Sequence, residues 1–74
     1  MTPEEYIAQL KKMRRSLTSI KNNIDEAIYN MERRLETGYE VCETSSKIAA
    51  GYAYEAAKAV KDGLSDMAEC EIEY

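Results

Sequence analysis

The sequence predicts an all-α fold: an antiparallel hairpin of two long helices that assembles with a second copy into a four-helix bundle. Pro3 is the only proline, and residues that favour helix, such as Ala, Glu, Lys and Met, make up much of the chain. Apolar residues recur at spacings of three and four, which is the period of an amphipathic helix. Gly38 lies near the midpoint of the 74 residues, where it can end one helix and let the chain reverse.

The first helix is predicted over about residues 3–36. Thr2 can act as its N-cap, Pro3 suits its first position, and Glu5 completes a T-x-x-E capping box. The apolar stripe that follows predicts a coiled-coil seam of about four heptads. Its members are Tyr6, Leu10, Met13, Leu17, Ile20, Ile24, Ala27 and Met31, widened by Ile7, Ile28 and Leu35.

A turn is predicted near residues 37–39, because Gly38 suits the left-handed position after a helix. Thr37 and Glu40 offer a second capping box that would restart the helix. Two alternatives stay open. The hydroxyl cluster at residues 44–46 competes for backbone hydrogen bonds and offers a rival turn. One uninterrupted helix is also compatible with the sequence, since the three-four spacing barely breaks at Gly38.

The second helix is predicted over about residues 40–68, followed by an acidic tail at 69–74. The stripe expected to face the first helix is Ile48, Tyr52, Ala56, Val60 and Leu64. A shallower stripe is then available to another chain: Ala50, Tyr54, Ala57 and Lys61. Tyrosine supplies a large contact area and a polar tip. Tyr54 is therefore the leading candidate for an interface anchor, and Tyr52 is a second partner-binding candidate.

Self-association follows from the amount of apolar surface. Two helices alone cannot cover the whole stripe of the first helix together with that of the second. A chain of 74 residues also buries only a modest part of its surface, and association with another chain is a common source of the missing stability. We expect a homo-oligomer, most simply a homodimer, that acts by binding a protein partner.

Charge is distributed unevenly along the chain, whose formal net charge is −4. Up to Arg34 there are seven bases and five acids, and beyond it three bases and nine acids. The densest basic patch is Lys11, Lys12, Arg14 and Arg15. In a hairpin that turns at residue 38 this patch would face Asp62, Asp66 and Glu69, which we expect to neutralise it. The net acidity argues against nucleic acid as a partner.

The acidic end of the chain is a second candidate binding region. Asp66, Glu69, Glu71 and Glu73 can dock on a basic protein surface, including one that normally holds nucleic acid. In size and acidity the chain resembles the small acidic phage inhibitors of bacterial defence systems. That resemblance implies an alternative function as an inhibitor, although no motif in the sequence is specific to such proteins.

No enzyme activity, cofactor or metal site is expected. Histidine is absent, and Cys42 and Cys70 fit reduced thiols better than a zinc site or a disulfide scaffold. The run L-x-x-I-K-x-x-I-D at residues 17–25 resembles the first helix of all-helical chorismate mutases over nine residues. Where that family continues with a second Ile-Asp pair and a catalytic arginine, this chain has Ala-Ile at 27–28 and then Gly38. The catalytic role is therefore not carried over.

Two long helices with a tight elbow also resemble the WXG100-type secretion partners in outline. The elbow here is Glu36-Thr37-Gly38 without tryptophan, and Tyr54-x-x-x-Lys58 lacks the acid of an export motif. A secretion partner is thus kept only as an alternative, beside a scaffold segment of a larger particle. No apolar run is long enough for a membrane span and the first residues are acidic, so we expect a soluble, cytoplasmic protein without membrane contact.

Overall fold

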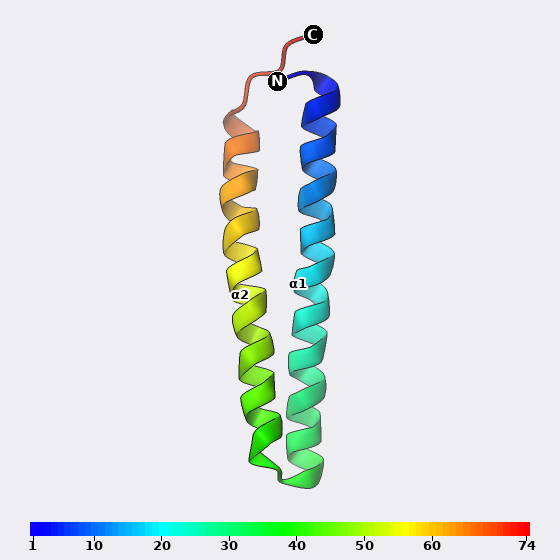
Figure 1. The fold of residues 1–74 in the computed structure, drawn as a ribbon, viewed down its shortest axis with the longest axis vertical. Coiled ribbons are helices and arrows are strands. Elements are labelled where there is room, and N and C mark those ends of the chain that lie inside the picture. Colours follow the sequence, from blue (N-terminus) through cyan, green and yellow to red (C-terminus); the bar gives the residue numbers. More distant parts are fainter.

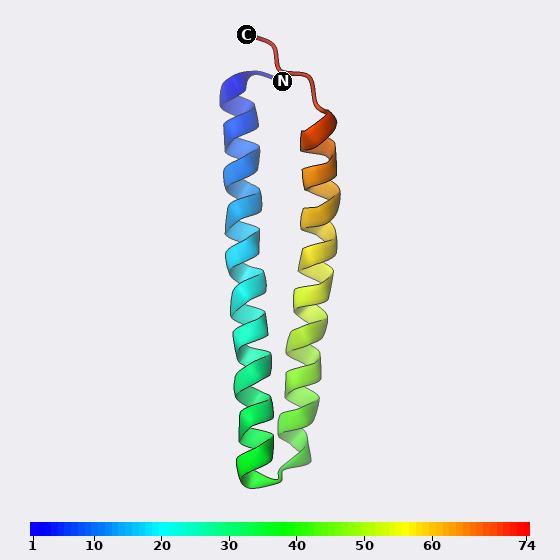
Figure 2. The ribbon, with the colours of Figure 1, turned by 180° about the vertical axis from the view of Figure 1, so that it is seen from behind.

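Two antiparallel helices form the whole fold (Figure 1). The computed structural model describes residues 1–74, with α1 at Pro3–Thr37 and α2 at Glu40–Glu69. The hairpin is a thin rod, since its Cα atoms extend over 58 × 15 × 11 Å. Both views show the helices side by side, with the two termini at the end away from the turn (Figure 1, Figure 2). The predicted all-α hairpin is confirmed, and the alternatives of one continuous helix and of a turn at residues 44–46 are wrong.

Local signals at both ends of α1 act as the sequence predicts. The Glu5 N–H donates a hydrogen bond to Thr2 Oγ1 at 3.2 Å, and Pro3 occupies the first turn, where its missing N–H costs nothing. At the other end Gly38 adopts the left-handed conformation with φ 75°, and its N–H donates to the Arg34 carbonyl at 2.9 Å. A side chain would be strained at that φ, so Gly38 fixes the position of the turn.

The predicted capping box of Thr37 and Glu40 is wrong. Tyr39 is the N-cap residue of α2, and no side chain caps that helix. Thr37 is the last residue of α1, where its hydroxyl donates to the Arg33 carbonyl at 2.8 Å and accepts from the Tyr39 N–H at 3.3 Å. Because Thr37 is still helical, it cannot take the extended conformation that an N-cap requires. The reversal is therefore confined to the two residues between the helices.

The interface between the helices, here called the seam, consists mostly of small and polar side chains, with only a few bulky apolar ones. All six buried residues lie on α2: Cys42, Ser46, Ala49, Ala53, Val60 and Met67. Half-buried Ala56 and Gly63 continue the same spacing of three and four. The half-buried residues of α1 that repeat with this period are Tyr6, Met13, Ser16, Ile20, Asn23, Ala27, Asn30 and Arg34. Small side chains at the contact let the two helices approach closely.

Two hydrogen bonds cross the seam from a side chain to the opposite backbone. The Ser46 hydroxyl donates to the Ala27 carbonyl at 2.7 Å, near the middle of the seam's turn-side half. The Tyr6 hydroxyl donates to the Met67 carbonyl at 3.1 Å, near the termini. Each polar group finds a partner across the seam, and no buried side-chain nitrogen or oxygen is left without one.

The helices approach each other closely beside Gly63. A methyl group placed on this residue would lie 2.5 Å from Cε and 2.9 Å from Sδ of Met13. At the turn end, Arg34 Nε lies 3.7 Å from a Glu43 carboxylate oxygen across the seam. These two contacts fix the register of the hairpin, so that each residue of α1 has a known neighbour on α2.

The predicted choice of facing stripes is partly wrong. On α1, four of the residues assigned to the seam are exposed instead: Leu10, Leu17, Ile24 and Met31. On α2, Ala56 and Val60 lie in the seam as predicted, but three others are exposed: Ile48, Tyr52 and Leu64. The reason is geometric. Successive positions turn by about 100° around a helix, so the apolar stripe of α1 is wide, and the small-residue ridge of α2 packs along one edge of it.

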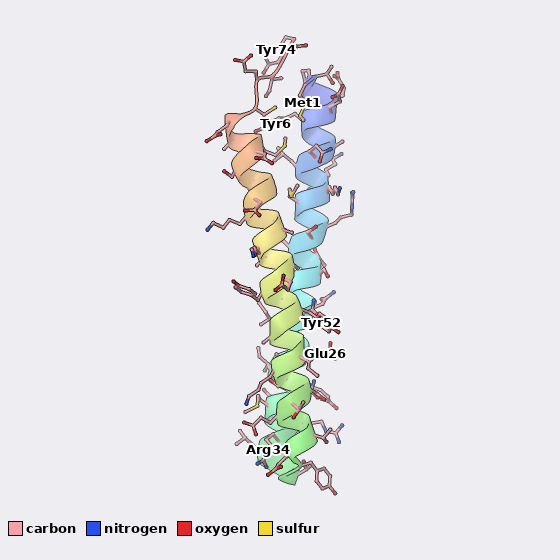
Figure 3. The ribbon with its side chains drawn as sticks, turned by 60° about the vertical axis from the view of Figure 1, so that its left-hand side comes forward. Met1, Tyr6, Glu26, Arg34, Tyr52 and Tyr74 are labelled. Carbon is pink, nitrogen blue, oxygen red and sulfur yellow. The ribbon has the colours of Figure 1, made fainter.

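The acidic tail folds back to the N-terminus. The Glu73 N–H donates to the Met1 carbonyl at 2.8 Å, and the Met1 ammonium group donates to the Glu71 carbonyl at 3.4 Å. Figure 3 shows Met1, Tyr6 and Tyr74 together at this end. The two cysteines are free thiols, one buried and the other half-buried. The termini are thus held together at the end opposite the turn.

Candidate interaction face

Bulky apolar side chains gather along one flank of the hairpin and are left uncovered. From α1 they are Ile7, Leu10, Leu17, Ile24, Ile28, Met31 and Leu35, and from α2 Ala50, Tyr54, Ala57 and Leu64. Their spacings of three, four and seven residues place them next to the seam on the same side of both helices. We name this set the apolar face. It runs along almost the whole length of α1.

The middle of the apolar face is a groove between the helices. Every residue that lines it is apolar: Ile20, Ile24, Ala27, Ile28, Ala50, Ala53, Tyr54 and Ala57. Isoleucines form the α1 wall, whereas alanines form the floor and the α2 wall. Tyr54 stands beside them with 65% of its surface exposed. A groove of this kind fits apolar side chains from another helix, because it has few polar groups to leave unpaired.

The opposite face of the hairpin is mixed in polarity. A shallow hollow there is lined by Glu26, Ser45, Ile48, Ala49 and Tyr52. Figure 3 shows Tyr52 and Glu26 on the same side of the rod. Tyr52 is as exposed as Tyr54, at 64%, but the two residues stand on opposite faces. The two candidate tyrosines therefore cannot anchor the same flat interface, and the structure associates only Tyr54 with the apolar face.

The stripe expected to be open to another chain is exposed as the sequence predicts. Its members are Ala50, Tyr54, Ala57 and Lys61. The sequence does not reveal that the bulky residues of α1 join this stripe, because their period equally fits a place in the seam. An available signal was the three-four spacing of mostly small residues on α2, which is unbroken by a large side chain from Cys42 to Ala56. That spacing marks a close-packed ridge, which needs no large side chains opposite it.

The basic patch is not neutralised by the acids of α2, contrary to the prediction. The structure contains three ion pairs: Lys21 with Asp25 at 2.9 Å, Arg34 with Glu43 at 3.7 Å and Lys47 with Glu43 at 3.7 Å. Lys11, Arg14 and Arg15 lie on the side of α1 away from the seam, which Met13 and Ser16 occupy. Lys12 lies at the flank of the seam, beside Ala56 and Ala59, but pairs with no acid of α2. Lys11 and Arg14 border the apolar face together with Ile7.

The acidic candidates are all exposed and form no ion pair. They are Asp66, Glu69, Glu71 and Glu73, with Asp62 beside them on α2. Asp62, Asp66 and Glu69 lie on the mixed face rather than on the apolar face, as their helical positions require. The acidic end and the apolar face are therefore separate surfaces, and each can be tested without disturbing the other.

No three His, Cys, Asp or Glu side chains come close enough together to hold a metal ion. Neither helix combines the length and the apolar character that crossing a membrane requires. In comparisons with known proteins, no family model, no curated protein and no solved structure matches the chain.

Proposed function

We propose that the chain is a non-catalytic protein–protein interaction module that self-associates through its apolar face. The expected product is a dimeric four-helix bundle, whose outer surfaces then bind a protein partner in an adaptor or regulatory role. The observation that carries this proposal is the contrast between the two sides of α1. Polar Ser16, Asn23 and Asn30 alternate with Met13 and Ile20 on its seam side, whereas most of its bulky apolar residues, such as Leu17 and Ile24, are exposed.

The accessible area supports self-association quantitatively. The chain exposes 5747 Å². A compact folded monomer of 8.4 kDa exposes only about 4,600 Å², so the excess is about 1,100 Å². A standard protein interface removes about 800 Å² from each partner, and obligate homodimers remove more. Pairing of two apolar faces would therefore bring the exposed area of each chain into the ordinary range.

The hairpin interior also provides little stability of its own. Five apolar residues are buried, three of them alanine or cysteine, and no side chain is fully buried. Burial of a large apolar side chain contributes about 1.5–3 kcal/mol, and only Val60 and Met67 approach that size here. Long helices owe most of their stability to such packing rather than to helix propensity. A second chain on the apolar face supplies the missing core.

Substitution of Tyr54 tests this proposal. Tyr54→Ala removes the largest side chain that α2 contributes to the apolar face, and a symmetric dimer loses it twice. We expect the dimer dissociation constant to rise at least about thirtyfold, while the helix content of the hairpin is retained. Tyr52→Ala is the matched control, because it truncates an equally exposed tyrosine on the opposite face. Equal effects of the two substitutions on sedimentation equilibrium would contradict the proposal.

A second candidate function is docking of the acidic end on a basic protein, as an inhibitor would. It is favoured by the absence of ion pairs at Asp66 and Glu69, whose charges are free to act outward. Here the chain should capture a basic protein from an extract at low salt and release it at about 0.5 M salt, where charges are strongly screened. Reversal to lysine at positions 66, 69, 71 and 73 should abolish capture without affecting self-association. Unchanged capture by the reversed chain would rule this function out.

A further inference from the structure

We infer that the apolar face is covered by a second copy of the chain lying antiparallel, with α1 packed on α1 and the two turns at opposite ends. The inference rests on the proposed self-association and specifies its geometry. The twofold axis crosses the helices beside Ile20 and Lys21, close to the midpoint of α1 at Pro3–Thr37. The residues that carry this geometry are the bulky stripe of α1 and the charges that border it.

Two arrangements bring one apolar face onto another with twofold symmetry. An axis parallel to the helices places both turns at the same end and sets α1 of one copy on α2 of the other. An axis across the helices places the turns at opposite ends and sets α1 on α1 and α2 on α2. In a twofold interface, if one residue contacts a second residue of the other copy, then the second residue also contacts the first one of the other copy. The surface must therefore be complementary to itself.

The bulky stripe of α1 has such a pattern. Its residues fall into pairs at equal distances from a point beside Ile20 and Lys21: Ile7 with Leu35, Leu10 with Met31, and Leu17 with Ile24. When α1 lies antiparallel on α1 of a second copy, these six side chains therefore meet one another, and Ile28 lies under the aliphatic part of Arg14. The hairpin register sets Tyr54 at the same level as Ile20, and both line the central groove. Tyr54 then packs near the axis on Tyr54 of the second copy.

The charges beside the stripe favour the same arrangement. The N-terminal half of α1 carries the basic patch, whereas its C-terminal half carries Asp25 and Glu32 beside the apolar face. Antiparallel packing brings Lys11 to Glu32 of the second copy, twice per dimer, and sets Arg14 over an apolar position. Near the axis, Lys21 already has Asp25 at 2.9 Å as a partner, which limits repulsion from Lys21 of the second copy.

The same-end arrangement opposes like charges instead. The register given by Met13 with Gly63 and Arg34 with Glu43 sets Arg14 against Lys61 of the second copy, and neither of these two has an ion-pair partner in its own chain. Like charges set face to face disfavour an interface and select against that partner orientation. The opposite-end arrangement also has like-charge approaches, between Lys21 and Lys21 at the axis and between Lys47 and Lys61, but at least one lysine of each is paired within its own chain. Lys47 is there partnered by Glu43, at 3.7 Å.

Spin-label distances between the two copies test the geometry. Single cysteines are introduced at Ala8→Cys, Asn22→Cys or Glu36→Cys in a Cys42→Ala, Cys70→Ser background and then labelled. All three positions are exposed, and they share one side of α1 that points away from the apolar face. At 1.5 Å per residue the antiparallel dimer separates the paired labels along the axis by about 38 Å, about 4 Å and about 46 Å respectively. The measured distance should therefore be shortest at residue 22 and longer at both ends.

The outcomes separate the geometry from the proposed function. Similar distances at all three positions would show that the turns lie at the same end, which overturns this inference but leaves self-association intact. A monomer mass together with no dipolar coupling at any position would overturn the proposed function as well. The unlabelled background variant must sediment like the unmodified chain, and dilution of labelled with unlabelled chains must weaken the coupling if it arises between copies.

Discussion

Replacing Leu17 and Ile24 together by glutamate is expected to abolish self-association and to leave the hairpin helical. Both side chains are about half exposed in the single chain, at 51% and 46%, so carboxylates at these positions remain hydrated there. In the proposed dimer the same positions meet across the interface, where four unpaired carboxylates would lose water at a cost of several kcal/mol each. We expect the dimer dissociation constant to rise by more than about a thousandfold. Sedimentation equilibrium and circular dichroism measure the two effects.

The matched control for this pair is Asn22→Glu with Tyr29→Glu. These residues have the same seven-residue spacing and are exposed on the side of α1 away from the apolar face. The added charge is the same, so a change in overall charge cannot explain a difference between the two double variants. If Leu17→Glu with Ile24→Glu lost helix content, Leu17→Gln with Ile24→Gln would test the same face with neutral side chains. An unchanged dimer in both apolar-face variants would show that this face is not the interface.

Enlarging the seam should destabilise the hairpin itself. Ala49 is 3% exposed, so Ala49→Leu would force three additional carbon atoms between the helices. Such overpacking costs about 1–3 kcal/mol, which in a chain of this size lowers Tm by roughly 4–24 °C. Ala8→Leu is the control, because Ala8 is exposed on α1 and the substitution has the same small effect on helix propensity. Melting curves at one chain concentration compare the two, since the Tm of a dimer depends on concentration.

The result of this substitution bears on the character of the seam. A loss of stability at Ala49 alone confirms that small residues hold the helices close together. Equal melting temperatures for Ala49→Leu and Ala8→Leu would instead show that the helices can separate at little cost. The hairpin would then be an open pair of helices rather than a close-packed one, and the buried position of Ala49 would not describe the protein in solution.

The helix limits and the turn could be predicted from the sequence because their causes are local. Thr2 and Pro3 begin α1 through the first few residues alone, and Gly38 ends it through its own φ. The choice of facing stripes could not be predicted in the same way. Hydrophobic periodicity shows that a stripe must be covered, but not whether the same chain or another chain covers it. Assigning the bulkiest residues to the intramolecular contact was therefore wrong for Leu17 and Ile24.

The charge prediction failed for a related reason. The position of the turn decides which residues of the two helices lie at the same height along the hairpin. The prediction that the basic patch lies at the height of Asp62 and Asp66 was therefore correct. The rotation of each helix about its own axis decides whether two such groups meet, and it depends on which residues form the seam. With Met13 in the seam, Lys11, Arg14 and Arg15 point away from α2, and Lys12 lies at the flank of the seam without an acidic partner. The candidate site could thus be predicted as a stripe containing Tyr54, but not in its full extent.

Sedimentation equilibrium of the unmodified chain at micromolar concentration tests the central claim most directly. The claim is that a second copy covers the apolar face, which a single hairpin leaves exposed. The expected mass is twice the 8.4 kDa of one chain, with dissociation only on strong dilution. A single species of 8.4 kDa throughout that range would contradict it.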